Sequence, residues 1–245
     1  MEWFSPTTVS EACRMLCTPG ARIVAGCTAV PPRSLLRYES GPLIDLSGLV
    51  DLRRIARVGD RLRIGAMVTL EALASDNRVA VDLPLLAHAA RQVGDAVVRR
   101  QATIGGNLMA RGGWELPATL LALGTYLRVA GPYKERTEDA VALCDPEFAL
   151  GEGEVLVAVE LAAQPAAIWS YRRATTNGGA FLCAVAGTRG SGGANLFLAG
   201  GANHPLRLVH GREVPALRSD ALASGAYRRR LVSVLADEAA AELAA

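Results

Sequence analysis

Residues 102–108, ATIGGNL, bring a hydroxyl, two adjacent glycines and a carboxamide together between two apolar runs. The glycines let the backbone approach a ligand closely because no Cβ intervenes, and successive amide N–H groups in a turn form a concavity that suits an anion. Thr103 and Asn107 add side-chain hydrogen-bond donors. This combination predicts binding of a phosphate or pyrophosphate, with an ordinary tight turn between two elements as the alternative.

Another glycine-bearing stretch lies earlier in the chain, at residues 22–31, RIVAGCTAVP, where a short apolar run ends in a predicted turn around Gly26. In chain order, residues 22–31 are called the first stretch and residues 102–108 the second stretch. Two such stretches favour a phosphate ligand over two unrelated turns. The chain has one lysine, Lys134, and it stands outside the GK[ST] context that a P-loop requires. We therefore expect backbone amides, and not lysine side chains, to meet the negative charge.

Other side chains with reactive chemistry do not assemble into a second site. The five cysteines are odd in number and scattered, which argues against a disulfide framework and predicts a reducing, cytoplasmic compartment. Cys13 and Cys17 would share a helix face but lack a second ligand pair, so we interpret them as small hydrophobic residues and predict no metal site. His88 falls within an apolar-striped helix and is interpreted as a packed or half-exposed residue. No Ser/His/Asp triad is assembled, so no catalytic side chain is predicted.

Composition narrows the class of protein. Hydrophobic residues make up 51% and charged residues 20%, which predicts a folded chain with a sizeable core. The net charge of +2 is too small to indicate nucleic acid or an acidic membrane as partner. We interpret the basic run at residues 228–230 as the solvated face of an amphipathic helix. The N-terminus lacks a signal-peptide pattern, and no run of about 18 apolar residues predicts a membrane span.

The elements that would position the glycine stretches follow from caps and periodicity. Thr8 and Glu11 form a capping-box pattern that opens a helix ending at residue 16, and Thr69 is a predicted cap for a helix over residues 70–74. Residues 58–61, VGDR, predict a hairpin turn. Further helices are predicted at 34–38, 83–93, 116–123 and from 226 to the C-terminus, and strands at 23–25, 43–46, 126–129, 155–161, 168–172, 181–187 and 195–199.

Taken in order, these motifs resemble those of one family, the FAD-binding (medium) subunit or domain of molybdenum hydroxylases such as carbon monoxide dehydrogenase and xanthine dehydrogenase. The family's AGG[TH][SD]-like loop corresponds to AGCTA at residues 25–29, and its TIGGN loop to residues 103–107. The resemblance continues through IDL at 44–46, LRIGA at 62–66, ELPA at 115–118 and YRR at 171–173.

The resemblance implies an α+β chain of two domains. Residues 1–163 would form an FAD-binding domain of the para-cresol methylhydroxylase type, divided into small α/β subdomains of about 1–55 and 56–163. Residues 164–245 would form a shortened C-terminal α+β domain of the carbon monoxide dehydrogenase flavoprotein type, with a three-stranded antiparallel sheet and helices.

The resemblance also implies where FAD would be held. The first stretch would line the pyrophosphate and ribityl chain, and Val93 would lie near the adenine. Glu115 would form a hydrogen bond with a sugar hydroxyl, whereas Leu156 and Arg173 would approach the isoalloxazine ring. The full set of expected cofactor-binding residues is Ile23, Val24, Ala25, Gly26, Cys27, Thr28, Ala29, Val30, Val93, Thr103, Ile104, Gly105, Gly106, Asn107, Glu115, Leu156 and Arg173.

Departures from the family pattern keep three functions open. Cys27 replaces a glycine and would cost roughly 1–2 kcal/mol if its φ is positive. Ala29 removes a hydrogen-bond donor, and residues 108–114 differ from the family's sequence, with Arg111 adding a charge and Trp114 available for stacking or packing.

The first functional hypothesis is an FAD-binding subunit that passes electrons from iron–sulfur and molybdenum partners to NAD, oxygen or a quinone. The others are a free-standing flavoenzyme acting on a small molecule, and a degenerate subunit that has lost flavin.

Overall fold

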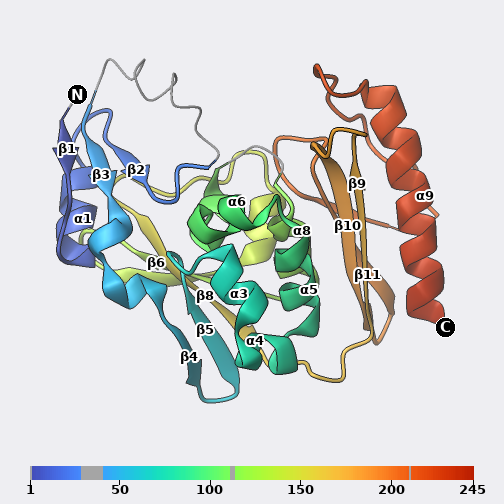
Figure 1. Ribbon diagram of the computed structural model, residues 1–245, viewed down its shortest axis with the longest axis horizontal. Coiled ribbons are helices and arrows are strands. Elements are labelled where there is room, and N and C mark those ends of the chain that lie inside the picture. The colour runs from blue at the N-terminus through green and yellow to red at the C-terminus, as the bar shows by residue number, and fades with distance from the viewer. Residues whose placement is uncertain (1, 29–40, 111–113, 210) are drawn as a thin grey trace.

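The computed structural model describes residues 2–28, 41–110, 114–209 and 211–245. Three units, each built on its own sheet, follow one another along the long axis of the molecule, and the two termini lie at opposite ends (Figure 1). The observed architecture of helices with one small parallel sheet and two larger antiparallel sheets confirms the α+β class. The helix predicted at residues 34–38 lies outside the described residues.

The N-terminal unit is a small parallel sheet in the order β1-β3-β2, with one helix packed on it. Its elements are β1 (Trp3–Phe4), α1 (Val9–Leu16), β2 (Arg22–Val24) and β3 (Leu43–Asp45), followed by the 3-10 helices η1 (Leu46–Gly48) and η2 (Val50–Arg53). The predicted cap is confirmed, because the Thr8 hydroxyl accepts a hydrogen bond from the Glu11 amide. The Glu11 carboxylate accepts from the Thr7 amide at 2.7 Å, one residue before the position that a capping box predicts.

The central unit has a five-stranded antiparallel sheet in the order β4-β5-β8-β6-β7. Its strands are β4 (Ile55–Val58), β5 (Arg61–Gly65), β6 (Tyr126–Ala130), β7 (Glu135–Asp139) and β8 (Val155–Ala162). The hairpin predicted at residues 58–61 is confirmed, with Gly59 at φ +62° in the turn. The edge strand β7 was not predicted, because its sequence ERTED has no apolar alternation.

Short helices cover one side of the central sheet and reach the C-terminal unit (Figure 1). They are α3 (Leu70–Ser75), α4 (Asn77–Asp82), α5 (Pro84–Gln92), α6 (Ala96–Gln101), α7 (Ile104–Met109) and α8 (Leu116–Ala122), with η3 (Ala140–Cys144) after β7. Thr69 caps α3 as predicted, accepting from the Ala72 amide at 3.2 Å. One hydrophobic core runs from β5 and β8 through α3, α5 and α8 to the C-terminal sheet, so the two larger units share buried surface.

The C-terminal unit is an antiparallel sheet in the order β12-β11-β10-β9, with one long helix against its outer face (Figure 1). Its elements are β9 (Trp169–Thr175), β10 (Phe181–Gly190), β11 (Gly193–Ala199), β12 (Leu206–Leu208) and α9 (Gly225–Ala244). The sheet therefore has a short fourth strand, β12, beyond the three predicted. Side chains of β9 alternate between two partners. Ser170 and Arg172 contact Glu242 of α9, whereas Tyr171 joins the core shared with the central unit.

Among the described residues, no helix is both long enough and apolar enough to cross a membrane.

Candidate cofactor-binding site

A cavity of about 860 Å³ lies where all three units meet. Ligand pockets usually measure about 300–1,000 Å³, so this one has room for a large ligand. Of the expected cofactor-binding residues, the cavity is lined by Ile23, Val24, Ala25, Gly26, Cys27, Thr28, Val93, Thr103, Gly105, Gly106, Asn107, Glu115, Leu156 and Arg173. Ile104 is not in the lining, because its side chain is fully buried in the core. Ala29 and Val30 lie outside the described residues.

The two glycine stretches touch each other through Gly26. A Cβ on Gly26 would lie 1.9 Å from the Gln101 carbonyl oxygen and 3.1 Å from the Ala102 Cα, where the second stretch begins. Only glycine permits this backbone-to-backbone approach. Gly26 therefore allows the backbones of the two segments to pack against each other, which places both stretches on one wall of the cavity.

The second stretch is the start of helix α7, which corrects the expectation of a glycine turn. Thr103 is the N-cap, and its hydroxyl accepts a hydrogen bond from the Gly106 amide at 3.1 Å. The Ile104 and Gly105 amides donate to the Val68 and Ala66 carbonyls. Because the protein already satisfies these amides, they cannot form the predicted amide cradle for an anion.

Three backbone amides of the first stretch have no partner among the residues that the structure describes. Within the described part of the chain, the amides of Gly26, Cys27 and Thr28 donate to no acceptor. The second stretch keeps two side-chain donors, the Thr103 hydroxyl hydrogen and the Asn107 amide nitrogen. The Asn107 Oδ1 atom is used within the protein, accepting from the Leu116 amide at 3.1 Å. Donors for an anion therefore come from backbone in the first stretch and from side chains in the second.

The two glycines of the second stretch have different roles. A Cβ on Gly105 would lie 2.8 Å from Ala66, so Gly105 permits close packing inside the protein. A Cβ on Gly106 would meet only the Thr103 hydroxyl within 4 Å, at 2.9 Å. Gly106 also lines the cavity and is half-buried. It is therefore the glycine whose missing side chain leaves room for a ligand.

Cys27 has φ +55°, and it is the non-glycine residue with positive φ in the described part of the chain. Left-handed backbone at such a residue costs roughly 1–2 kcal/mol, so Cys27→Gly should raise the free energy of unfolding by about 1 kcal/mol. FAD affinity should be unchanged or stronger, because the substitution removes a side chain from the cavity wall. Denaturant unfolding and FAD titration measure the two effects. Cys27→Ala is the matched control, since it removes the thiol but keeps the Cβ; equal stabilisation by both variants would refute the backbone explanation.

An ion pair connects the central and C-terminal units at the cavity wall. Glu115 precedes α8 and is only 3% exposed, and its Oε1 accepts from Arg173 Nη2 of β9 at 3.2 Å. Burial raises the pKa of Glu115, while the Arg173 charge acts in the opposite direction. The arginine also lies over Phe181, with its Cζ 5.7 Å from the ring centroid.

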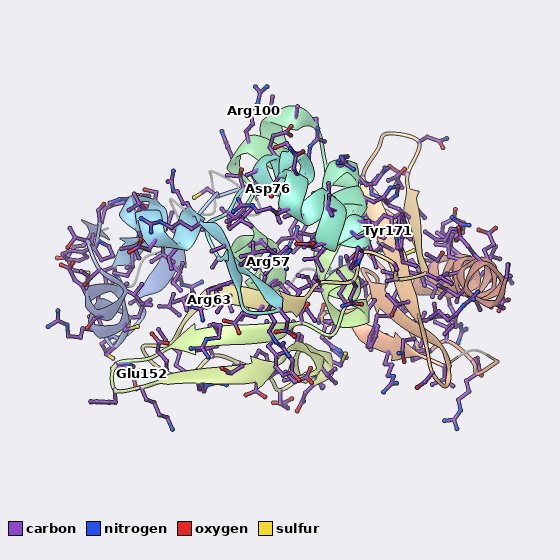
Figure 2. All side chains as sticks on the ribbon, turned by 90° about the horizontal axis from the view of Figure 1, so that it is seen from below. Arg57, Arg63, Asp76, Arg100, Glu152 and Tyr171 are labelled. Atoms are coloured by element: carbon purple, nitrogen blue, oxygen red, sulfur yellow. The ribbon has the colours of Figure 1, made fainter. Side chains whose placement is uncertain are left out.

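Sequence reasoning missed much of the apolar wall. Met67, Val98, Met109, Leu150 and Phe181 all line the cavity. Nothing in the sequence separates such residues from ordinary core positions, because both are apolar. Glu152 also lines the cavity, and it lies where the central sheet meets the N-terminal unit (Figure 2). Trp114 is in the lining too, with its indole nitrogen donating to the Ala110 carbonyl at 2.8 Å.

Comparisons with known proteins identify the family of the chain. A family model described as the FAD binding domain in molybdopterin dehydrogenase matches residues 1–163. The nicotine 6-hydroxylase medium subunit of Paenarthrobacter nicotinovorans is 31% identical over 178 residues, and the carbon monoxide dehydrogenase medium chain of Hydrogenophaga pseudoflava is 34% identical over 180. Each match covers 70% of this chain and 62% of the relative.

Solved structures extend the similarity over the whole chain. A carbon monoxide dehydrogenase from Hydrogenophaga pseudoflava, which lacks the Mo-pyranopterin moiety of its molybdenum cofactor, superposes with a TM-score of 0.87 at 26% identity. That superposition covers 98% of this chain and 95% of the other. Quinoline 2-oxidoreductase from Pseudomonas putida 86, at 24% identity and a TM-score of 0.87, shows the same fold. The chain belongs to the family of FAD-binding domains found in molybdopterin dehydrogenases.

Proposed function

We propose that this chain is the FAD-binding, electron-transferring subunit of a molybdenum hydroxylase. It would receive electrons from an iron–sulfur partner, supplied in turn by a molybdenum-cofactor partner, and pass them to NAD, oxygen or a quinone. The names of its relatives support an assembly, since they are called medium subunit, medium chain or complex subunit alpha.

The observation that carries the proposal is the single cavity shared by both glycine stretches and the Glu115–Arg173 pair. Its lining fits a dinucleotide: the amides of Gly26 to Thr28 have no partner among the described residues, and the wall at Gly106 is open where a Cβ would intrude. We propose that these groups, with Thr103 and Asn107, hold the diphosphate. Among the other expected contacts, Val93 would lie near the adenine and Leu156 and Arg173 near the ring. The remaining described lining residues of the first stretch, Ile23, Val24 and Ala25, would flank the ribityl chain.

When bound, the flavin would supply the electron chemistry. The chain's own part is to bind, orient and shield: its apolar wall excludes water, and its few polar groups fix one orientation. No protein nucleophile or acid–base pair is required for that role.

Two further assignments complete the proposal. We assign residues 1–163 to the FAD-binding domain and 164–245 to the C-terminal domain, supported by the end of the family match at residue 163 and by the separate C-terminal sheet. We place the protein in the cytoplasm, supported by its five cysteines, all of which are free.

Metal and flavin analysis of the protein purified from its own cells tests the function. We expect FAD together with iron and molybdenum in fixed ratio, and reoxidation of the dithionite-reduced flavin by NAD, oxygen or a quinone. Flavin without either metal, combined with turnover of a small substrate by the isolated chain, would instead establish a free-standing enzyme. A colourless chain that takes up no FAD would establish a degenerate subunit.

A further inference from the structure

The corner between helices α5 and α6 forms one wall of the cavity. Val93, Gly94 and Val98 of this α5–α6 corner (residues 93–98) all line the cavity. The chain turns at Gly94, which has φ +50°. Helix α6 then begins after its N-cap Asp95, whose side chain accepts from the Val98 amide at 2.8 Å. The shape of this wall therefore depends on where the N-terminal end of α6 is held.

Helix α6 has little apolar packing to hold it in place. None of its six residues is buried. Val98 is half-buried and packs against the hydrophobic core, whereas Val97 is 64% exposed. The far end of the helix is anchored by backbone, because the Ala102 carbonyl accepts from the Leu70 amide at 2.9 Å. An element with so few buried contacts opens at a low free-energy cost, so the N-terminal end of α6 needs a further anchor.

Arg99 supplies an anchor at that end. Its Nη1 atom donates to the carbonyl oxygens of Arg91, Val93 and Gly94 at 3.3, 3.3 and 3.4 Å. These carbonyls lie at the end of α5 and in the turn after it, where a helix leaves its carbonyl groups without partners of its own. The Nε atom donates to the Glu71 carboxylate of α3 at 2.9 Å. One guanidinium thus joins α3, the end of α5 and α6, a bridge that its planar fork of donors permits.

Arg99 stands behind the cavity wall and not in it. The lining contains Val93 and Val98 but not Arg99, and the Arg99 side chain is 18% exposed. Its acceptors are backbone carbonyls of the α5–α6 corner and a carboxylate of α3. Removing this side chain therefore leaves every lining side chain unchanged and alters how firmly the wall is held.

We propose, on the basis of the function above, that Arg99 is the positioning residue of this cavity wall. It holds the N-terminal end of α6 against α3 and the end of α5, and so keeps Val93 and Val98 in contact with the bound dinucleotide. The arginine itself does not touch the cofactor. Without it, the N-terminal end of α6 moves away, the dinucleotide loses apolar contacts, and it dissociates faster.

Coupling between Arg99 and Val98 tests this role. FAD affinity and dissociation rate are measured for Arg99→Gln, Val98→Ala and the double variant. Arg99→Gln should weaken FAD binding by about tenfold, the scale of one charge-assisted hydrogen bond, mainly through faster dissociation. Val98→Ala removes two methyl groups from the wall and should weaken binding by about fivefold, but by less than about twofold once Arg99 is replaced. A role confined to global stability would leave the Val98 effect equal in both backgrounds.

Amide hydrogen exchange of the cofactor-free chain is the second readout. In Arg99→Gln the amides of α6 should exchange about tenfold faster, whereas those of α3 and β8 should keep their wild-type rates. Arg100→Gln is the matched control, because Arg100 is the next residue of α6 and lies exposed at the outer surface (Figure 2). It removes the same charge at little cost in helix propensity, so FAD affinity and amide exchange should both stay at wild-type values.

Equal effects of Val98→Ala in the two backgrounds, or wild-type exchange of α6 in Arg99→Gln, would overturn the positioning role. If Arg99→Gln does not fold, Arg99→Lys takes its place. The lysine keeps a charge beside Glu71 but replaces the planar fork by a compact ammonium, so the same changes should appear in smaller size. A wild-type chain that binds no FAD would refute the proposed function instead, and the exchange of α6 would still decide whether Arg99 holds the helix.

Discussion

A Gly106→Val chain is expected to fold and to bind FAD about 100-fold more weakly than wild type, the scale of a few kcal/mol of steric overlap with a bound ligand. Gly106 lines the cavity, and a Cβ there would meet only the Thr103 hydroxyl at 2.9 Å. The added side chain would therefore occupy ligand space, and within the protein it would displace the Thr103 hydroxyl that caps α7. Gly106 also lies in the first turn of α7, and its φ is not positive, so the backbone conformation does not require glycine.

Far-UV circular dichroism and thermal unfolding establish whether Gly106→Val is folded, and flavin fluorescence measures its FAD affinity. Gly192→Val is the matched control, because a Cβ on Gly192 would have no atom within 4 Å and Gly192 lies outside the cavity. Wild-type FAD affinity in a folded Gly106→Val chain would show that this part of the wall does not contact the cofactor.

Gly26→Ala should instead destabilise the whole fold, by about 3 kcal/mol, and lose FAD binding as a consequence. Its Cβ would lie 1.9 Å from the Gln101 carbonyl oxygen and 2.7 Å from the Gln101 carbonyl carbon. Both are backbone atoms, so no side-chain rotation can relieve the overlap. The first stretch would have to move away from the segment that leads into α7.

Chemical denaturation measures the loss in the Gly26→Ala variant. Gly48→Ala is a suitable control, since the nearest atom to its new Cβ is the Pro6 carbonyl oxygen at 3.6 Å, an ordinary contact. Wild-type stability of Gly26→Ala would mean that the two stretches are not in backbone contact. Together, Gly26→Ala and Gly106→Val separate a glycine that brings protein segments together from a glycine that leaves space for a ligand.

Local signals in the sequence predicted many elements. The caps at Thr8 and Thr69 and the hairpin around Gly59 depend on neighbouring residues, and all three are confirmed. Gly124, directly after the predicted helix at residues 116–123, has φ +64°, the left-handed conformation that glycine commonly adopts past a helix end. The family resemblance was carried by such local motifs in order, and the family match confirms it.

Features that depend on distant contacts were not predictable. Helix α7 contains two glycines, which are poor helix formers, so its sequence indicated a turn; its Gly105 is buried against Ala66 and its capping bond to Thr103 completes the first turn. The contact between Gly26 and Gln101 joins segments 75 positions apart, and nothing local indicates it. The same holds for the Glu115–Arg173 pair, whose partners come from different units.

The most direct test of the account is a crystal structure of the chain with FAD bound. We expect the diphosphate oxygens within about 2.7–3.2 Å of the backbone amides at Gly26 to Thr28, with Gly106 in van der Waals contact beside them. A diphosphate bound elsewhere, or those three amides pointing away from it, would contradict the central claim.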